Sequence, residues 1–239
     1  ITRISGIFIL KMRSIPSIIL CQPDSHKGCS VCCGLFNFID TRKESLDVFL
    51  QHACDDRDET KLNLISISQI NKPDVRDYTT YICPYQGYIE NGRPGCRIHP
   101  QVSGVEGRDR SLYGVKICNS YFCPAHSIIP DSDKLLLINH VDCWYLYSRA
   151  IIDPAGFVWI AGEVRTLMKE KEDILVLKDA IVCSLETLSK LQDLIDRPLF
   201  FYSIAEYYEN LDSFSLVGNS EKAIRCRKEI TTFLKNLIL

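Results

Sequence analysis

Seven cysteines in the first half of the chain have spacings that suit the ligands of a metal ion. They are Cys29, Cys32, Cys33, Cys83, Cys96, Cys118 and Cys123. In the stretch GCSVCCG, two residues separate Cys29 from Cys32, and Cys33 follows directly. Zinc sites with four tetrahedral ligands and iron–sulfur clusters with cysteine ligands both use such spacings on tight turns. The pattern therefore predicts that these thiolates bind zinc or an iron–sulfur cluster.

His99 follows Cys96 after two intervening residues, a spacing found in mixed cysteine–histidine zinc sites. We therefore include His99 among the candidate metal ligands. His126 follows Cys123 by three positions and is a secondary candidate. For His26 and His140, a surface or hydrogen-bonded histidine is the simpler interpretation.

The remaining cysteines carry a weaker signal, since a single cysteine is usually a small buried apolar residue. This interpretation fits Cys143, Cys183 and Cys226. Cys54 could be a weak ligand with His52, and Cys21 was left outside the candidate set because it adjoins the predicted leader. Disulfides are the main alternative for the seven clustered cysteines. The adjacency of Cys32 and Cys33 argues against simple disulfide pairing, because two neighbouring cysteines can bind two different metals or two sides of one cluster.

Composition limits the classes of function open to this chain of 239 residues. Its formal net charge is -2 and its 46% of hydrophobic residues suffice for a substantial core. No basic excess favours nucleic acid, and no apolar stretch is long enough for a membrane span. The twelve cysteines then indicate metal chemistry in the cytoplasm rather than a secreted disulfide framework.

Sequence texture divides the chain into three regions. Residues 1–20 are predicted to be a leader or upstream sequence that is not structural, because Lys11, Arg13 and Pro16 interrupt their apolar run. Residues 21–130 are rich in glycine and proline, which interrupt helices and strands, and form the predicted metal-binding or cluster-binding region. Residues 131–239 have helical periodicity.

The predicted elements give an α+β fold that is mostly α, with a loop-rich cysteine-cluster half packed against a C-terminal helical bundle. In the first half we expect a helix over 42–52, capped by Thr41, and a strand over 61–68. In the second half we expect helices over 134–151, 156–171, 173–195, 199–211 and 219–238, the first capped by Asp131 or Ser132.

The cysteine pattern resembles the YkgJ-type cysteine-cluster family, described as a putative zinc- or iron-chelating domain. The family pattern is a Cys-x(2-4)-Cys-Cys group, a Cys-Pro-Phe/Tyr group and later cysteines beside aromatic residues. The matching residues are Cys29, Cys32 and Cys33, then Cys83 in CPYQ, Cys96 with His99 in CRIHP, and Cys118 with Cys123 in KICNSYFC. The match covers residues 28–126, about 40% of the chain. The stretch between Cys96 and Cys118 is longer than the family's, and GRDRSLYG stands where the family has Arg-Pro.

The resemblance implies a metal-binding protein whose biological role is uncharacterised. Lysine N-methylases thought to carry an iron–sulfur cluster resemble the same family. An iron–sulfur-dependent protein-modifying enzyme is therefore the alternative, with a substrate cleft among Trp144, Tyr145, Trp159, Phe200 and Phe201. The implied partner is a metal ion, and the sequence identifies no protein partner, substrate or methyl-donor site.

Overall fold

The computed structural model describes residues 17–55, 74–78, 80–168, 173–193, 195 and 199–238. The strand predicted over 61–68 and the side chain of Cys54 lie outside these residues. Within them the fold is mostly helical with a single two-stranded sheet, which confirms the predicted α+β class. No helix among the described residues is both long and apolar enough to cross a membrane.

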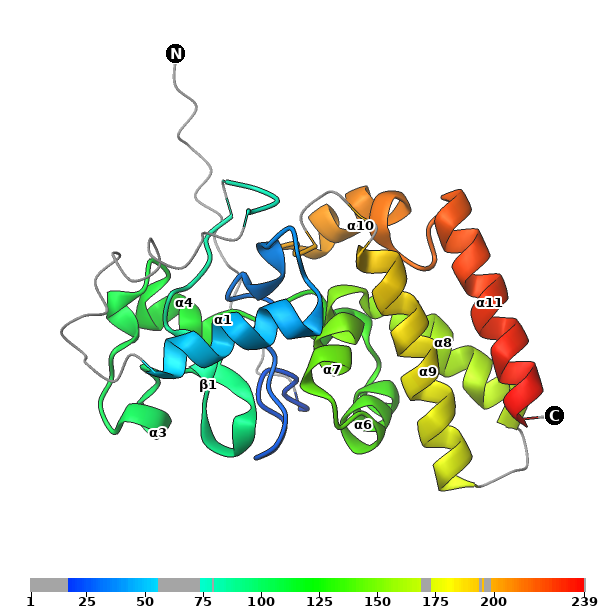
Figure 1. The fold of residues 1–239 in the computed structure, drawn as a ribbon, viewed down its shortest axis with the longest axis horizontal. Coiled ribbons are helices and arrows are strands. Elements are labelled where there is room, and N and C mark those ends of the chain that lie inside the picture. Colours follow the sequence, from blue (N-terminus) through cyan, green and yellow to red (C-terminus); the bar gives the residue numbers. More distant parts are fainter. Residues whose placement is uncertain are drawn as a thin grey trace, which may run out of the picture.

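The first half consists of short elements joined by turns (Figure 1). They are η1 (Leu35–Asn37), α1 (Lys43–Asp55), β1 (Gln86–Tyr88), η2 (Glu90–Gly92), β2 (Pro94–Cys96), α3 (Pro100–Ser103), η3 (Arg108–Arg110), α4 (Gly114–Ser120) and α5 (Ala125–Ile128). The strands β1 and β2 form an antiparallel hairpin in which Gln86 pairs with Cys96. The predicted helix over 42–52 is confirmed as α1, although the side chain of Asp40, not Thr41, accepts a hydrogen bond from the backbone N–H of Arg42.

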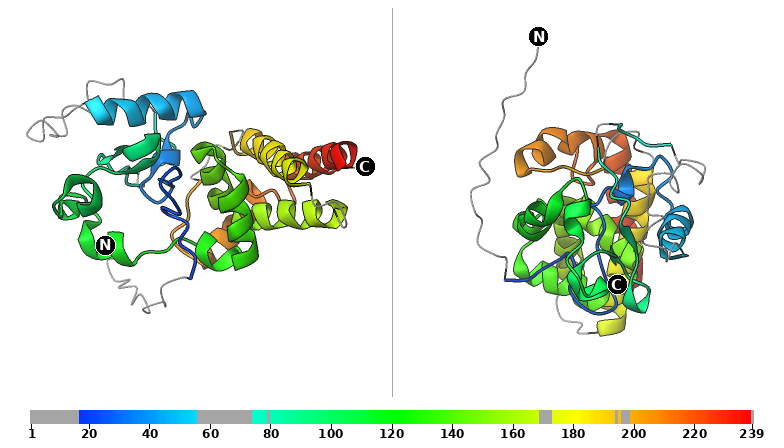
Figure 2. Two further views of the ribbon diagram at one scale, coloured as in Figure 1. Left: turned by 90° about the horizontal axis from the view of Figure 1, so that it is seen from below. Right: turned by 90° about the vertical axis from the view of Figure 1, so that its left-hand side faces the viewer.

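Longer helices make up the second half. They are α6 (Asp131–His140), α7 (Trp144–Ile152), α8 (Pro154–Met168), α9 (Ile174–Asp193), α10 (Ile204–Phe214) and α11 (Glu221–Ile238). Helices α8, α9 and α11 pack together at the end of the molecule farthest from α3, with α6 and α7 between them and the cysteine-rich half (Figures 1 and 2). Ala223, Ile230 and Leu234 form the buried stripe of α11, as its helical period predicts.

The predicted continuous helix over 134–151 is wrong, because the chain breaks between α6 and α7. Val141 has extended backbone angles and is fully buried, and Cys143 is also extended. The turn lets α7 bury every one of its residues between the two halves. The polar residues His140 and Asp142 flank the break, but Val141 between them continues the apolar spacing, which explains the error.

Residue Leu20 also differs from expectation. It is fully buried, its backbone N–H donates to His126 Nε2, and its carbonyl oxygen accepts from the Tyr147 hydroxyl. The end of the segment predicted to be a non-structural leader is therefore part of the core. Its hydrogen bonds fix the position of the next residue, Cys21.

Helix α7 contributes the buried Arg149, which joins the two halves. Its guanidinium donates to the carbonyl oxygen of Thr41 at 2.8 Å and forms an ion pair with Asp193 at the end of α9. The same group lies over the rings of Phe36 and Tyr145, 5.1 and 4.7 Å from their centroids. A buried cation needs such partners, because its desolvation is costly.

A second buried charge, Asp153, lies where α7 meets α8. Its carboxyl group accepts hydrogen bonds from the hydroxyls of Tyr207 and Ser215 and from the backbone N–H groups of Gly156 and Leu216. A Cβ atom at Gly156 would lie 2.1 Å from Asp153 Oδ2, so only glycine permits this close approach. Asp153 thereby joins α8 to α10 and to the turn before α11.

Replacement of Asp153 by Asn should lower the free energy of unfolding by about 1–3 kcal/mol, because an amide NH₂ would face the N–H of Leu216 in place of an acceptor. Burial raises the pKa of Asp153. The wild-type carboxyl therefore stabilises the fold most at low pH, and this stability is lost as the pH rises through the folded-state pKa. Urea unfolding at a series of pH values should show the difference between the two proteins shrinking as pH increases.

The control for this experiment is Asp142→Asn, which removes an exposed ion pair with Lys178. It should change the unfolding free energy by less than about 1 kcal/mol. Equal losses in the two variants would contradict the role given to Asp153.

Candidate metal centre

Eight cysteines gather in two groups on either side of the Cys32–Cys33 peptide bond. The inner thiol set is Cys21, Cys29, Cys32 and Cys123. The outer thiol set is Cys33, Cys83, Cys96 and Cys118. Each set combines residues that are far apart in the sequence, and together they contain all seven cysteines of the predicted set plus Cys21. All eight are free thiols.

The inner thiol set is positioned by backbone hydrogen bonds and by the helical core. The backbone N–H of Cys29 donates to the carbonyl oxygen of Cys21 over 2.9 Å. Cys123 is buried directly before α5, and Tyr147 of α7 lies beside the set with its hydroxyl fixed by Leu20. The inner thiol set therefore forms where the N-terminal segment, α5 and α7 meet.

Proximity within the inner thiol set is visible in the pKa values. Burial raises the pKa of Cys29 most, and the charges of the other three thiolates raise it further. Burial also raises the pKa of Cys21, with added contributions from Cys32 and Cys123. The pKa of Cys123 is raised to about 12 by burial and by Cys32. Close, buried thiolates destabilise one another in this way unless a cation compensates them.

His126 lies between two members of the inner thiol set. Its Nε2 accepts a hydrogen bond from the backbone N–H of Leu20 at 3.1 Å and lies 4.0 Å from Cys21 Sγ. Burial lowers the pKa of His126 to about 4, so the ring is neutral. A neutral ring that accepts at Nε2 carries its proton on Nδ1, which lies 3.6 Å from Cys123 Sγ. His126 is thus placed to donate to that sulfur, as a residue that orients a ligand does.

If the inner thiol set binds metal as its cysteines predict, replacement of His126 by Gln should weaken that binding about 10- to 100-fold, because Cys123 loses its donor. Binding at the outer thiol set should be unchanged. Competition titrations with a zinc chelator measure both affinities. The control is His140→Gln on α6, a half-buried histidine away from both sets. Equal weakening at both sets would show that the variant acts on the fold and not on Cys123.

The outer thiol set is built on the β1–β2 hairpin. The backbone N–H of Cys83 donates to the carbonyl oxygen of Cys33 at 2.8 Å, and Gln86 Nε2 donates to the same oxygen. The pairing of Gln86 with Cys96 then brings Cys96 to this end of the hairpin. Gly34 has a φ of 85°, and a Cβ there would lie 2.3 Å from the carbonyl oxygen of Tyr81. The glycine after Cys33 therefore allows the two segments to approach.

Cys118 completes the outer thiol set from the exposed helix α4. Its sulfur lies 3.9 Å from Ser111 Oγ, and its charge contributes to the raised pKa values of Cys83 and Cys96. Burial is the first cause of both shifts and takes the pKa of Cys83 to about 11. The buried guanidinium of Arg108 acts in the opposite direction on Cys96. Arg108 therefore supplies positive charge beside the outer thiol set.

The two sets meet at Cys32 and Cys33. A hydrogen bond from the Cys33 thiol is the main cause that lowers the pKa of Cys32, and the same bond is the main cause that raises the pKa of Cys33. The Cys33 side chain is close to Cys83 and Cys96, whereas the Cys32 charge acts on Cys21, Cys29 and Cys123. Adjacent residues thus belong to different sets.

The thiols are grouped without converging on a point. In the described part of the chain, no three or more Cys, His, Asp or Glu side chains are arranged to coordinate one metal ion. Tetrahedral coordination with metal–sulfur distances of about 2.3 Å requires sulfurs about 3.8 Å apart. Coordination would therefore need rotation of the thiol side chains and tightening of the turns that carry them.

His99 has a local structural role. It precedes α3, and its Nδ1 accepts a hydrogen bond from the backbone N–H of Gln101 at 3.2 Å. Burial and then the charge of Arg108 lower its pKa. The cap uses the lone pair of Nδ1, so the neutral ring carries its proton on Nε2, and neither nitrogen offers a metal a free lone pair in this arrangement.

Three other cysteines lie away from both sets. Cys226 is buried on α11 and its thiol donates to the carbonyl oxygen of Thr187 at 3.7 Å. Cys143 packs against the core, and Cys183 is half-buried on α9. The predicted packing role fits all three.

Comparisons with known protein families, with curated proteins and with solved structures found no match. The site must therefore be interpreted from its own chemistry. Cys21 was missed because it adjoins the segment that the sequence predicts to be a non-structural leader. The only available signal was its residue type.

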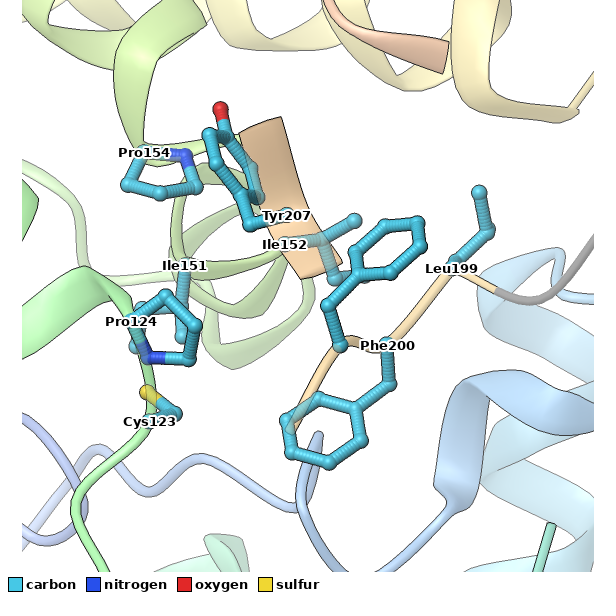
Figure 3. A pocket seen from close by; sticks show the side chains of 9 residues that line it. Cys123, Pro124, Ile151, Ile152, Pro154, Leu199, Phe200 and Tyr207 are labelled. Atoms are coloured by element: carbon cyan, nitrogen blue, oxygen red, sulfur yellow. The ribbon is translucent and has the colours of Figure 1, made fainter. Parts of the chain in front are cut away.

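A small pocket adjoins the inner thiol set. Its volume is about 10 Å³, and it is lined by Cys123, Pro124, Ile151, Ile152, Pro154, Leu199, Phe200, Phe201 and Tyr207. Cys123 and Pro124 form one wall, Phe200 lies opposite, and Tyr207 lies beside Pro154 (Figure 3). No charged side chain lines it.

The aromatic residues proposed for an enzyme cleft do not share one. Trp144 and Tyr145 are buried in the core, where Trp144 packs edge-on against Tyr145 and Tyr88. Only Phe200 and Phe201 line the pocket beside Cys123. Most of the aromatic group therefore has a packing role.

Proposed function

We propose that this protein binds metal at two centres, one in each thiol set, as zinc ions or iron–sulfur clusters. The observation that carries the proposal is that Cys32 belongs to the inner thiol set and Cys33 to the outer thiol set, so that each set has four cysteines. Four thiolates are the usual complement of both a structural zinc site and an iron–sulfur cluster. The donor chemistry suits soft metals, because thiolates select zinc and iron–sulfur clusters over hard cations.

Several features of the surroundings support the proposal. Buried thiolates that raise one another's pKa are stabilised when a cation replaces their protons. His126 and Ser111 lie beside ligand sulfurs as orienting groups do in metal sites. Free thiols in this number suit a reducing compartment, so we place the protein in the cytoplasm. The resemblance to the YkgJ-type family agrees with this function.

Substitution of the two adjacent cysteines tests the proposal. Cys32→Ser should bind one equivalent of zinc instead of two and lose the inner centre, and Cys33→Ser should lose the outer centre. The double variant should bind none. Elemental analysis after zinc reconstitution of the full chain gives the stoichiometry, and Cys183→Ser is the matched control with two equivalents.

Failure of the wild-type protein to bind zinc or iron would refute metal binding. A single equivalent lost completely in both single variants would instead indicate one shared centre. The visible absorption spectrum of anaerobically purified protein distinguishes the metals, since an iron–sulfur cluster is coloured and zinc is not.

A further inference from the structure

The two thiol sets differ in how solvent can reach them. Each set has one buried cysteine, Cys123 in the inner set and Cys83 in the outer set, and the others except Cys118 are half-buried. The sets differ at Cys118 of the outer set, which is exposed. It projects from α4, a helix of seven residues with no buried member.

The surroundings of Cys118 are also open. Leu112 and Ile117 are 75% and 41% exposed, and Lys116 and Asn119 beside them are exposed too. Helix α4 packs mainly on η3, which is itself a single short turn (Figure 1). An incoming ligand can therefore approach the outer thiol set from the side of Cys118 without prior unfolding of the core.

Arg108 connects the helix that carries Cys118 to η3. Its guanidinium donates to Asn119 Oδ1 in α4, next to Cys118, and its charge is paired with the carboxylate of Glu106. Arg108 therefore holds α4 in place while Cys118 stays on the exposed side.

We propose that the outer thiol set is an exchangeable metal centre and the inner thiol set a structural one, with Cys118 as the ligand that dissociates during exchange. This inference rests on the proposed function. In the exchange step, a donor atom of an incoming ligand, such as a thiolate, would bind the metal as the metal–sulfur bond of Cys118 breaks. The released Cys118 thiolate would take up a proton from solvent, and no electron would be transferred.

Release of zinc to a chelating dye tests the exchange. The full chain loaded with two equivalents of zinc is mixed with excess 4-(2-pyridylazo)resorcinol, and absorbance reports free zinc. We expect two phases of equal amplitude, with the first faster by at least about tenfold, since the inner metal leaves only after local opening of the core. Cys118→Ser should lack the fast phase and keep the slow one within about twofold. Cys183→Ser, remote on α9, should show both phases unchanged.

A second measurement does not depend on a variant that folds. Limited alkylation of the zinc-loaded wild type with iodoacetamide, followed by peptide mass mapping, should modify Cys118 first, with loss of one zinc. Release of both zinc ions at one rate, or first alkylation at Cys29, Cys32 or Cys123, would overturn the inference and leave metal binding standing. A wild-type chain that binds no zinc would overturn the proposed function and the inference together.

Discussion

Under the proposed function, removal of the metal by a chelator should unfold the β1–β2 hairpin and α4 while the helices of the second half remain protected. Structural zinc contributes about 10–16 kcal/mol of apparent binding free energy in zinc-finger peptides, and this energy becomes folding energy when the site forms only in the folded state. The hairpin region has little else to stabilise it, because β1 and β2 are three residues each and α3 is a single turn, whereas η1 and α1 contribute Phe36 and Leu46 to the apolar core. A two-stranded hairpin is marginal alone.

Helices α8, α9 and α11 should resist the same treatment. Their core contains Phe157, Leu188 and Leu234, all fully buried and remote from the thiols. Hydrogen exchange measured by mass spectrometry should show rates in β1, β2 and α4 increasing by at least about 100-fold after chelation. Peptides of α8, α9 and α11 should change by less than about threefold. Unchanged exchange throughout would mean that metal contributes nothing to the fold.

Replacement of Arg149 by Met should lower the free energy of unfolding by about 3–5 kcal/mol. The change removes the cationic partner of the ion pair, and Asp193 and the carbonyl oxygen of Thr41 keep neutral hydroxyl donors, Thr41 Oγ1 and the Tyr145 hydroxyl, in its place. Met keeps much of the apolar part of the side chain and its contact with Phe36, so the loss of unfolding free energy measures the removal of the guanidinium charge. Urea denaturation followed by circular dichroism measures it.

The matched control is Arg42→Met, which removes an exposed ion pair with Asp40. The expected change there is less than about 1 kcal/mol. Because Arg149 contacts both halves, its variant should also lower the cooperativity of unfolding. A loss no larger than that of the control would contradict the role of Arg149 as the connection between the halves.

Periodicity predicted most of the second half and failed at two positions, the break between α6 and α7 and the start of α10, which is Ile204 and not residue 199. The boundaries of α9 and α11 lie within a few residues of the predicted helices because each has one apolar face and one polar face. Helix α7 is buried all round, so its sequence has no polar face from which a break could be recognised. The buried Val141 at the break continued the apolar pattern.

The candidate site was predictable in composition but not in arrangement. Short spacings identified seven of the eight clustered cysteines, and the adjacency of Cys32 and Cys33 allowed for two centres. Which distant cysteine joins which set depends on the β1–β2 register and on the path of the N-terminal segment, and neither is encoded in local spacing. Arg149 illustrates the same limit, since nothing in its helical neighbourhood distinguishes it from a surface arginine.

The hydrogen bonds between Leu20 and the segment around His126 and Tyr147 have a consequence for biosynthesis. Cys21 and His126 are 105 positions apart. At a translation rate of about 5–20 residues per second, the earliest cysteine emerges from the ribosome about 5–20 s before the imidazole that it will adjoin. During this interval the nascent thiols are exposed to oxidants and to stray cations. The pairing of these segments therefore requires that Cys21 is still a free thiol when the residues around His126 have been synthesised.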